Sequence, residues 1–224
     1  MARSRRAGAT GVGAADRPQR MKVVFDLGGV LLRWQPHEFM PRLLPALAST
    51  PEAAHTLVLQ FFQLFGGDWG EFDRGSLDVA PLAERIARRV GLTPAEARIV
   101  IDAVPDELVP IAGTVELLHA LQARGHELFF LSNMPAPYAE LLEARNDFFG
   151  MFRDGLFSSR VGCIKPEPAI FDRAVRTFGS GVDDTVFIDD VAKNLVPAAA
   201  VGWQGILFRD PPQCAAELRA LGLL

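Results

Sequence analysis

Short apolar runs recur along the chain, and most of them follow a stretch with helical spacing. The apolar runs lie at 22–25, 127–131, 185–188 and 205–208. The last three are each preceded by a helix-like stretch that ends in glycine, at 115–125, 168–179 and 195–202. Strands that alternate with helices indicate an α/β fold, in which a Rossmann-like parallel sheet carries helices on both faces. A weaker strand-like segment lies at 156–161.

The segment 36–105 breaks this alternation, because its pattern is helical throughout. Thr50 and Pro51 predict the start of a helix that reaches residue 65, and Ser76 predicts a cap for another that ends before Gly91. Thr93 and Glu96 have the spacing of a capping box, which starts a third helix. We therefore expect a helical cap at 36–105, inserted after the first strand. The core then consists of 21–35 and 106–224, and 1–20 forms a flexible tail.

The composition is that of an ordinary globular protein, with 49% hydrophobic and 22% charged residues among 224. A net charge of −4 argues against nucleic-acid binding, which requires a basic face. No apolar run approaches the roughly 20 residues that cross a membrane, and the tail lacks the apolar middle of a secretory signal. Two cysteines without metal-ligand spacing predict reduced thiols. We expect a cytoplasmic monomer or homodimer that binds neither nucleic acid nor membrane.

Polar residues stand at or near the ends of the predicted strands, where a parallel sheet binds its ligands. They are Asp26, Ser132, Asn133, Lys165, Asp189 and Asp190. A lone Asp or a Ser-Asn pair at a strand end is usually a turn former, but a parallel sheet brings these residues together. Clustered carboxylates suit Mg2+, while the lysine, the hydroxyl and the backbone N–H groups near Asn133 suit phosphate oxygens. A carboxylate can then attack phosphorus and form an aspartyl-phosphate. This set predicts transfer of a phosphoryl group from a small phosphorylated molecule.

Four short motifs carry a family resemblance. They are DLGGVL at 26–31, LSN at 131–133, IKPE at 164–167 and FIDD at 187–190. In order and spacing they resemble the haloacid dehalogenase superfamily, subgroup I with an α-helical cap, over residues 21–224. Similar members include bacterial sugar-phosphate (glucose-1-phosphate-type) phosphatases and 2-haloacid dehalogenases. The resemblance implies a nucleophile at Asp26, phosphate ligands at Ser132 and Lys165, and Mg2+ as cofactor.

The same resemblance implies the remaining ligands of the metal. Beside Asp26, these are the backbone carbonyl of Gly28, the carboxylate of Asp190 and, as a second choice, that of Asp189. Asn194 matches a position that often orients the lysine or its surroundings.

Gly28 departs from the family pattern. Most phosphatases of the superfamily carry there a second Asp that protonates the leaving group, and losing such a group costs about a hundredfold to ten-thousandfold in rate. A phosphatase for substrates with an easy leaving group, such as an anomeric sugar phosphate, is the preferred interpretation. Two alternatives remain: a 2-haloacid dehalogenase or another hydrolase with an Asp nucleophile, and a catalytically silent binding protein. Retention of the paired aspartates argues against both.

The segment 66–75 joins two predicted cap helices and is rich in turn formers, acids and aromatic residues. The resemblance implies a loop that dips toward the nucleophile and helps to select the substrate. Asp68, Trp69 and Glu71 are therefore candidate specificity residues, with hydroxyl acceptors and a stacking face suited to a sugar. A loop anchored by its aromatic side chains is the simpler interpretation.

Overall fold

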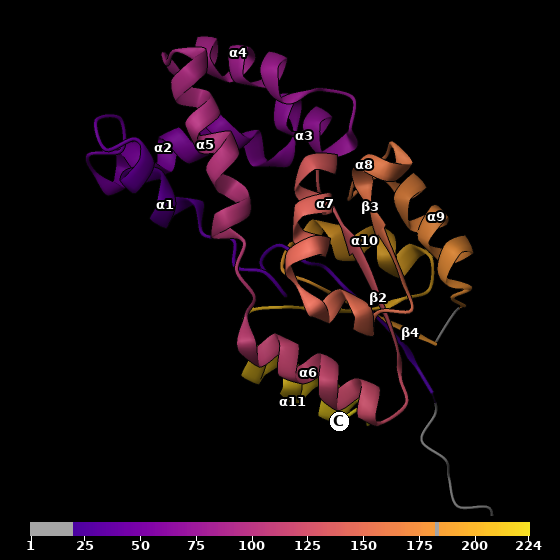
Figure 1. Ribbon diagram of the computed structural model, residues 1–224. Coiled ribbons are helices and arrows are strands. Elements are labelled where there is room, and N and C mark those ends of the chain that lie inside the picture. The colour runs from indigo at the N-terminus through magenta and orange to yellow at the C-terminus, as the bar shows by residue number, and fades with distance from the viewer. Residues whose placement is uncertain (1–19, 182–183) are drawn as a thin grey trace, which may run out of the picture.

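The computed structural model of the protein describes residues 20–181 and 184–224 (Figure 1). The tail predicted at 1–20 therefore lies, apart from its last residue, outside the described residues. The centre of the fold is a five-stranded sheet in the order β3-β2-β1-β4-β5, with every neighbouring pair parallel. The strands are β1 (Lys22–Phe25), β2 (Glu127–Ser132), β3 (Asp154–Phe157), β4 (Thr185–Asp189) and β5 (Gln204–Leu207). The predicted α/β fold with a parallel sheet is confirmed.

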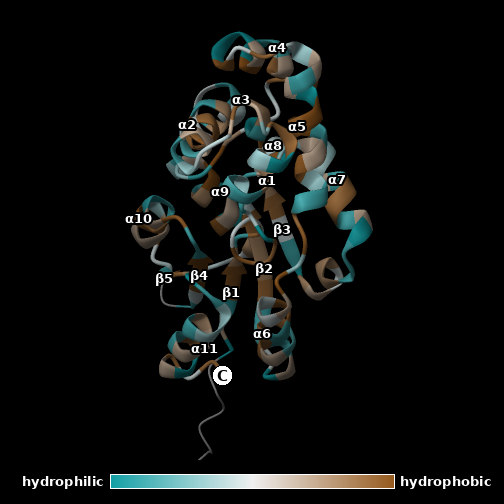
Figure 2. Cartoon of the chain, turned by 90° about the vertical axis from the view of Figure 1, so that its left-hand side faces the viewer, coloured by the Kyte–Doolittle hydropathy of each residue, from teal (hydrophilic) through white to brown (hydrophobic). Residues whose placement is uncertain are grey.

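Helices cover both faces of this sheet. The core helices are α6 (Ala112–Ala123), α7 (Ala136–Arg145), α8 (Ser158–Val161), α9 (Pro168–Phe178), α10 (Ala192–Ala200) and α11 (Pro211–Ala220), with a 3-10 turn η2 (Asp147–Met151). Val23 and Phe25 face one hydrophobic cluster, shared with α6 and α11, whereas Val24 faces the other, shared with α9 and α10. Successive side chains of β1 are buried on opposite faces, and β1 is the central strand of the sheet, between β2 and β4 (Figure 2).

One of the predicted strands ends earlier than its apolar sequence pattern indicated. The segment predicted at 156–161 forms β3 only as far as Phe157, and the chain then turns at once into α8. The turn buries Ser158 completely, and its hydroxyl accepts a hydrogen bond from the Met134 N–H at 2.9 Å. This bond holds the loop after β2 against the end of β3, at the edge of the sheet where the polar strand ends gather.

Five helices follow β1 in the sequence, before the chain returns to the sheet. They lie together above the carboxyl edge of the sheet (Figure 1). They are α1 (Pro36–Leu43), α2 (Pro51–Phe62), α3 (Gly67–Arg74), α4 (Val79–Val90) and α5 (Pro94–Glu107), with a 3-10 turn η1 (Gln63–Phe65). Thr50 caps α2, and the capping box between Thr93 and Glu96 is present. The predicted cap at Ser76 is wrong, since α4 begins after Asp78.

The segment 66–75 is a helix rather than a loop, and this changes which of its residues can face the sheet. Gly66 is extended, α3 follows, and Gly75 ends the helix in the left-handed conformation with φ +80°. Its Cβ would lie 2.9 Å from the Ser159 carbonyl oxygen, so glycine lets α3 approach the core closely. Residues four apart in α3 therefore share one face.

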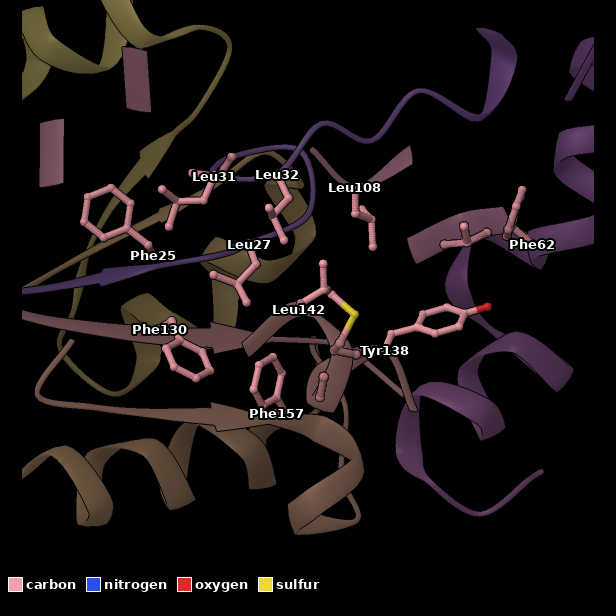
Figure 3. Close-up of a cluster of buried hydrophobic side chains, with 14 of the residues drawn as sticks. Phe25, Leu27, Leu31, Leu32, Phe62, Leu108, Phe130, Tyr138, Leu142 and Phe157 are labelled. Atoms are coloured by element: carbon pink, nitrogen blue, oxygen red, sulfur yellow. The ribbon is translucent and has the colours of Figure 1, made fainter. Parts of the chain in front are cut away.

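Aromatic side chains and polar bonds join the cap to the core. Phe72 of α3 packs edge-on against Tyr138 of α7 with ring centroids 5.5 Å apart, and within the cap Phe62 packs against Trp69 at 4.6 Å. Figure 3 shows Tyr138 and Leu108 between the sheet and Phe62. The Tyr138 hydroxyl donates to the Ile101 carbonyl at 2.5 Å. In the described part of the chain, no helix has the length and apolar character needed to span a membrane.

Candidate active site

The predicted site residues meet at the carboxyl edge of the sheet. Asp26 follows β1, Ser132 ends β2, Asp189 ends β4, and Lys165 lies in the loop before α9. The Lys165 ammonium stands 2.9 Å from the Asp26 Oδ1 and 2.7 Å from the Asp189 Oδ2. All four residues are buried. Parallel strands thus bring together groups that lie up to 163 positions apart in the sequence.

Asp189 is held by several donors, whereas Asp190 has an open side chain. The Val191 N–H donates to Asp189 Oδ1 at 2.8 Å, and the Asn194 amide donates to both Asp189 oxygens at 3.0 Å. Asn194 therefore orients the carboxylate rather than the lysine. The Asp190 carboxyl accepts a hydrogen bond from its own backbone N–H, makes no ion pair with any of the described residues, and is exposed where it lines the pocket.

The loop after β1 is shaped to receive Asp190. Gly29 has φ +81°, and a Cβ at this position would lie 2.2 Å from the Asp190 Oδ2. Only glycine allows the two loops to approach this closely. Gly28 is different, because a Cβ there would meet nothing within 4 Å and its φ is not positive. The absence of a side chain at Gly28 is therefore not imposed by the space around it.

The carboxylates affect one another's ionisation. Burial raises the pKa of Asp26 to about 7, with Lys165 lowering it and Asp189 and Asp190 adding to the rise. Asp190 is exposed to the pocket, and the partial loss of water around its carboxyl, together with the charge of Asp189, raises its pKa to about 6. Burial lowers the pKa of Lys165, but the two aspartates outweigh it and hold that pKa above its usual value. A charged lysine thus faces three carboxylates, and a cation beside them would favour their ionised forms.

These residues fit a divalent cation. Carboxylate oxygens of Asp26, Asp189 and Asp190 lie within 4.8 Å of one another. One lysine cannot neutralise three negative charges, and hard oxygen donors are the ligands that Mg2+ prefers. The Asn194 Oδ1 beside them is buried and has no donor among the described residues. The acceptors in this cluster therefore exceed the donors that the described chain supplies.

Asn133 fixes the backbone of Lys165. Its Nδ2 donates to the Lys165 carbonyl oxygen at 2.9 Å, and its Oδ1 accepts from the Lys165 N–H at 2.7 Å. The side chain of Asn133 is thus occupied in placing the lysine. The buried Ser132 lines the pocket, and its hydroxyl has no hydrogen-bond partner among the described residues. The predicted roles of Ser132 and of the backbone near Asn133 in phosphate binding stay predictions.

One pocket opens above the nucleophile, and its lining has two distinct parts. The polar floor consists of the lining residues Asp26, Ser132, Asn133, Lys165, Asp190 and Asn194, together with Asp189, which is buried beneath them and paired with Lys165. The apolar walls consist of Trp34, Trp69, Val104, Leu108, Met134, Pro135 and Tyr138. Asp73 lies among these walls, while Gly28, Val191 and Lys193 complete the lining. The cap and the core thus enclose the pocket together.

The three candidate specificity residues separate on α3. Trp69 lines the pocket, as does Asp73 four positions later. Asp68 is instead paired with Arg85 and Arg89 of α4, and Glu71 with Arg85. Sequence reasoning missed Asp73, although helical spacing from Trp69 would have indicated it. The predicted substrate contacts of Asp68 and Glu71 stay untested, and both residues lie outside the lining of this pocket.

Comparison with known proteins identifies the class. Residues 22–202 match the haloacid dehalogenase-like hydrolase family, and the chain belongs to this family of hydrolases. The sesquiterpene phosphatase astK of Aspergillus oryzae is 26% identical over 199 residues, which cover 88% of this chain and 94% of the relative. The predicted membership and hydrolase class are confirmed.

Solved structures share the fold. A family enzyme from Bacteroides thetaiotaomicron, in complex with magnesium and inorganic phosphate, has a TM-score of 0.64 and 21% identity over 85% of this chain and 95% of that chain. An L-2-haloacid dehalogenase from Xanthobacter autotrophicus with covalently bound chloropropionic acid has a TM-score of 0.63 and 17% identity, over 92% and 84%. At these identities the likeness concerns the fold.

Proposed function

We propose that the protein is a Mg2+-dependent phosphatase that hydrolyses a small phosphate monoester through an aspartyl-phosphate on Asp26. The observation that carries this function is the cluster of Asp26, Asp189 and Asp190 around Lys165. Phosphoryl transfer requires an in-line nucleophile and neutralisation of the phosphate charge. The floor supplies both. The magnesium-phosphate complex of a protein with the same fold, and the phosphatase named among the relatives, support the proposal.

In this mechanism an Asp26 oxygen bonds to phosphorus while the bond from phosphorus to the ester oxygen breaks, and that oxygen keeps the bonding electrons. Lys165 and the Ser132 hydroxyl hold the phosphate oxygens, while Asn133 keeps the lysine in place. When bound, Mg2+ supplies positive charge that neutralises the phosphate and the carboxylates. Its protein ligands would be Asp26, the Gly28 carbonyl and Asp190. Asp189 is the weaker candidate, because its two oxygens already accept from Lys165, Asn194 and Val191.

The walls favour a substrate whose organic part is largely apolar. The sequence predicted a sugar phosphate, whose hydroxyl groups need polar partners. Around the floor the structure places aromatic and aliphatic side chains, with the carboxyl of Asp73 as their one acidic group in the described pocket. Apolar walls with a few polar groups bind apolar ligands best. We therefore place an alkyl or terpenoid phosphate ahead of a sugar phosphate, in keeping with the relative's name.

A substrate panel tests this function. Purified protein is given p-nitrophenyl phosphate, decyl phosphate, farnesyl phosphate and glucose 1-phosphate, each with Mg2+ and with chelator. We expect phosphate release that is lost with chelator and in Asp26→Asn, and a higher kcat/KM for the apolar esters. Asp78→Asn is the matched control, because this exposed cap residue makes no side-chain hydrogen bond. Chelator-resistant halide release from 2-chloropropionate would instead identify a dehalogenase.

A further inference from the structure

Asp73 is a buried carboxyl in the pocket that the proposed mechanism has not used. Only 3% of its surface is exposed, yet it lines the same cavity as Asp26 and Gly28. It lies near the end of α3, on the helical face that also presents Trp69 to the pocket. The cap therefore brings an acidic group to the cavity from the side opposite the sheet.

The backbone of Asp73 is fixed to the core. Its carbonyl oxygen accepts a hydrogen bond from the buried Ser158 hydroxyl at 2.5 Å. The next residue, Arg74, makes a two-pronged ion pair with Glu167 and donates to the Gly162 carbonyl at 3.1 Å. Glu167 is two residues from Lys165. These contacts hold the end of α3 against the loop that carries the catalytic lysine, so the position of Asp73 relative to the floor is set by direct bonds.

The Asp73 carboxyl, in contrast, has no protein partner. Among the described residues, no donor reaches its oxygens and no cation pairs with it at salt-bridge distance. Around it stand the charges of Asp26 and Lys165 and the hydroxyl of Tyr138. Burial raises the pKa of Asp73 well above its usual range; Asp26 adds to the rise and Lys165 opposes it. This carboxyl is therefore protonated under conditions in which ordinary aspartates are ionised.

A purely structural role does not account for such a group. Burial of a carboxyl without a hydrogen-bond partner costs folding free energy, and an apolar side chain would pack against Trp69 and Tyr138 without that cost. A buried acid that keeps its proton can donate it to a substrate oxygen. Hydrolysis of an alkyl ester requires such a donor, because an alkoxide leaves slowly without protonation and Gly28, beside the nucleophile, has no side chain that could supply a proton.

We propose that Asp73 is the general acid and base of this enzyme, supplied by the cap in place of a side chain at position 28. The proposal rests on the proposed phosphatase function. As the Asp26 oxygen bonds to phosphorus, the bond from phosphorus to the ester oxygen breaks, and that oxygen takes the Asp73 proton to leave as an alcohol. The Asp73 carboxylate then takes a proton from water, whose oxygen bonds to phosphorus while the bond from phosphorus to the Asp26 oxygen breaks. Inorganic phosphate departs, and Asp26 and Asp73 return to their starting forms.

This assignment changes the expected range of substrates. Without a general acid, only esters with an easily expelled group would be hydrolysed quickly. With Asp73 in that role, esters of ordinary alcohols become substrates, including those with an alkyl or terpenoid alcohol. The acid is then expected to matter most for alkyl esters and least for aryl esters, because a nitrophenolate leaves without protonation. General acid catalysis contributes about a hundredfold to ten-thousandfold.

The test compares leaving groups in Asp73→Asn, which keeps the size of the side chain and removes its proton. In single-turnover experiments with Mg2+, we expect the first turnover of the best alkyl phosphate to slow by about 10²–10⁴-fold. With p-nitrophenyl phosphate the first turnover slows by less than about tenfold. A burst of one nitrophenolate per enzyme then precedes a slow steady state, because the intermediate lacks its general base. Asp78→Asn serves as the matched control and shows neither effect.

Rescue separates chemistry from structure. The space beside Gly28 is open, so Gly28→Asp in the Asp73→Asn background restores a carboxyl beside the nucleophile and recovers alkyl ester turnover by at least about tenfold. Equal losses with both leaving groups and no burst would overturn the role of Asp73. The role of Asp73 would also be overturned if the Asp73→Asn variant is folded by circular dichroism and hydrolyses the alkyl ester at the wild-type rate. If the wild-type protein releases no phosphate from any ester, the proposed phosphatase function is wrong, and the role of Asp73 as general acid is wrong as well.

Discussion

In the polar floor of the pocket, the buried charged side chains form ion pairs with one another. The apolar walls instead surround the carboxyl of Asp73, which has no hydrogen-bond or ion-pair partner among the described residues. Lys165 is paired with both Asp26 and Asp189, and Asp189 has further donors. Asp73 has none among the described residues. A paired charge has a fixed position, and an unpaired buried acid keeps its proton. The floor is thus built to hold phosphate chemistry in one geometry, and the walls to meet the variable part of the substrate.

The largest effect is expected from removing the one cation that joins the buried charges of the floor. Lys165→Met leaves Asp26 and Asp189 buried without a counter-charge, and breaking such a pair costs about 3–5 kcal/mol. We expect a loss of unfolding free energy of that size in urea titrations without metal, together with a drop in kcat of at least about 10²–10³-fold. Lys165→Met/Asp189→Asn recovers part of the stability. Equal stability of Lys165→Met and wild type would mean that the floor is not held by this charge.

Asn133→Ala tests how far the floor depends on exact placement of the lysine. The substitution removes both hydrogen bonds to the Lys165 backbone, and displacement of a catalytic group by about 1 Å costs about a hundredfold. We expect kcat to fall by about 10–100-fold with KM changed less than about threefold. A large rise in KM with kcat preserved would instead make the Asn133 side chain a phosphate ligand.

Within the walls, Tyr138→Phe removes one hydroxyl and keeps the apolar ring. The Ile101 carbonyl then loses its donor where cap and core meet, and an unsatisfied buried acceptor costs about 1–2 kcal/mol. We expect the midpoint of urea unfolding to shift accordingly. A variant as stable as wild type would show that water reaches this carbonyl, and hence that the cap–core contact at α7 is looser than the floor.

The smallest effect concerns the opposite end of the sheet, remote from floor and walls. His126 accepts from the Met21 N–H at 3.2 Å and lies 3.1 Å from the Leu223 carbonyl. Burial lowers the pKa of His126. As the pH falls through about 6.5, His126 takes up a proton in the unfolded chain but remains neutral in the native protein. The unfolding free energy therefore declines as the pH falls. His126→Gln should flatten this slope between pH 5 and 7 in urea titrations. An unchanged slope would assign the pH dependence elsewhere.

The floor could be predicted from the sequence and the walls could not. Parallel strands end at one edge, so Asp26, Lys165 and Asp189 were expected to meet even though they lie far apart in the chain. No such rule places the cap. The glycines and acids of 66–75 resemble a loop, and only the helical phase of α3 separates Trp69 and Asp73 from Asp68 and Glu71.

Space and partners also remained hidden from the sequence. The open surroundings of Gly28, and the close approach that Gly29 permits to Asp190, depend on how two loops pack. The clamp of Asn133 on Lys165 joins residues 32 positions apart through one side chain. A motif indicates which residues lie together in the site. It does not indicate which of their atoms already form hydrogen bonds within the protein.

The ion pair between Arg74 and Glu167 has a consequence for the timing of turnover. It lies one residue from Asp73 and two from Lys165, so a cap that swings away for substrate entry must break it. The same movement withdraws the proton donor from the phosphate site. An open molecule would then be unable to complete the reaction on a passing ester, and each catalytic cycle would begin only when the cap has closed behind its substrate.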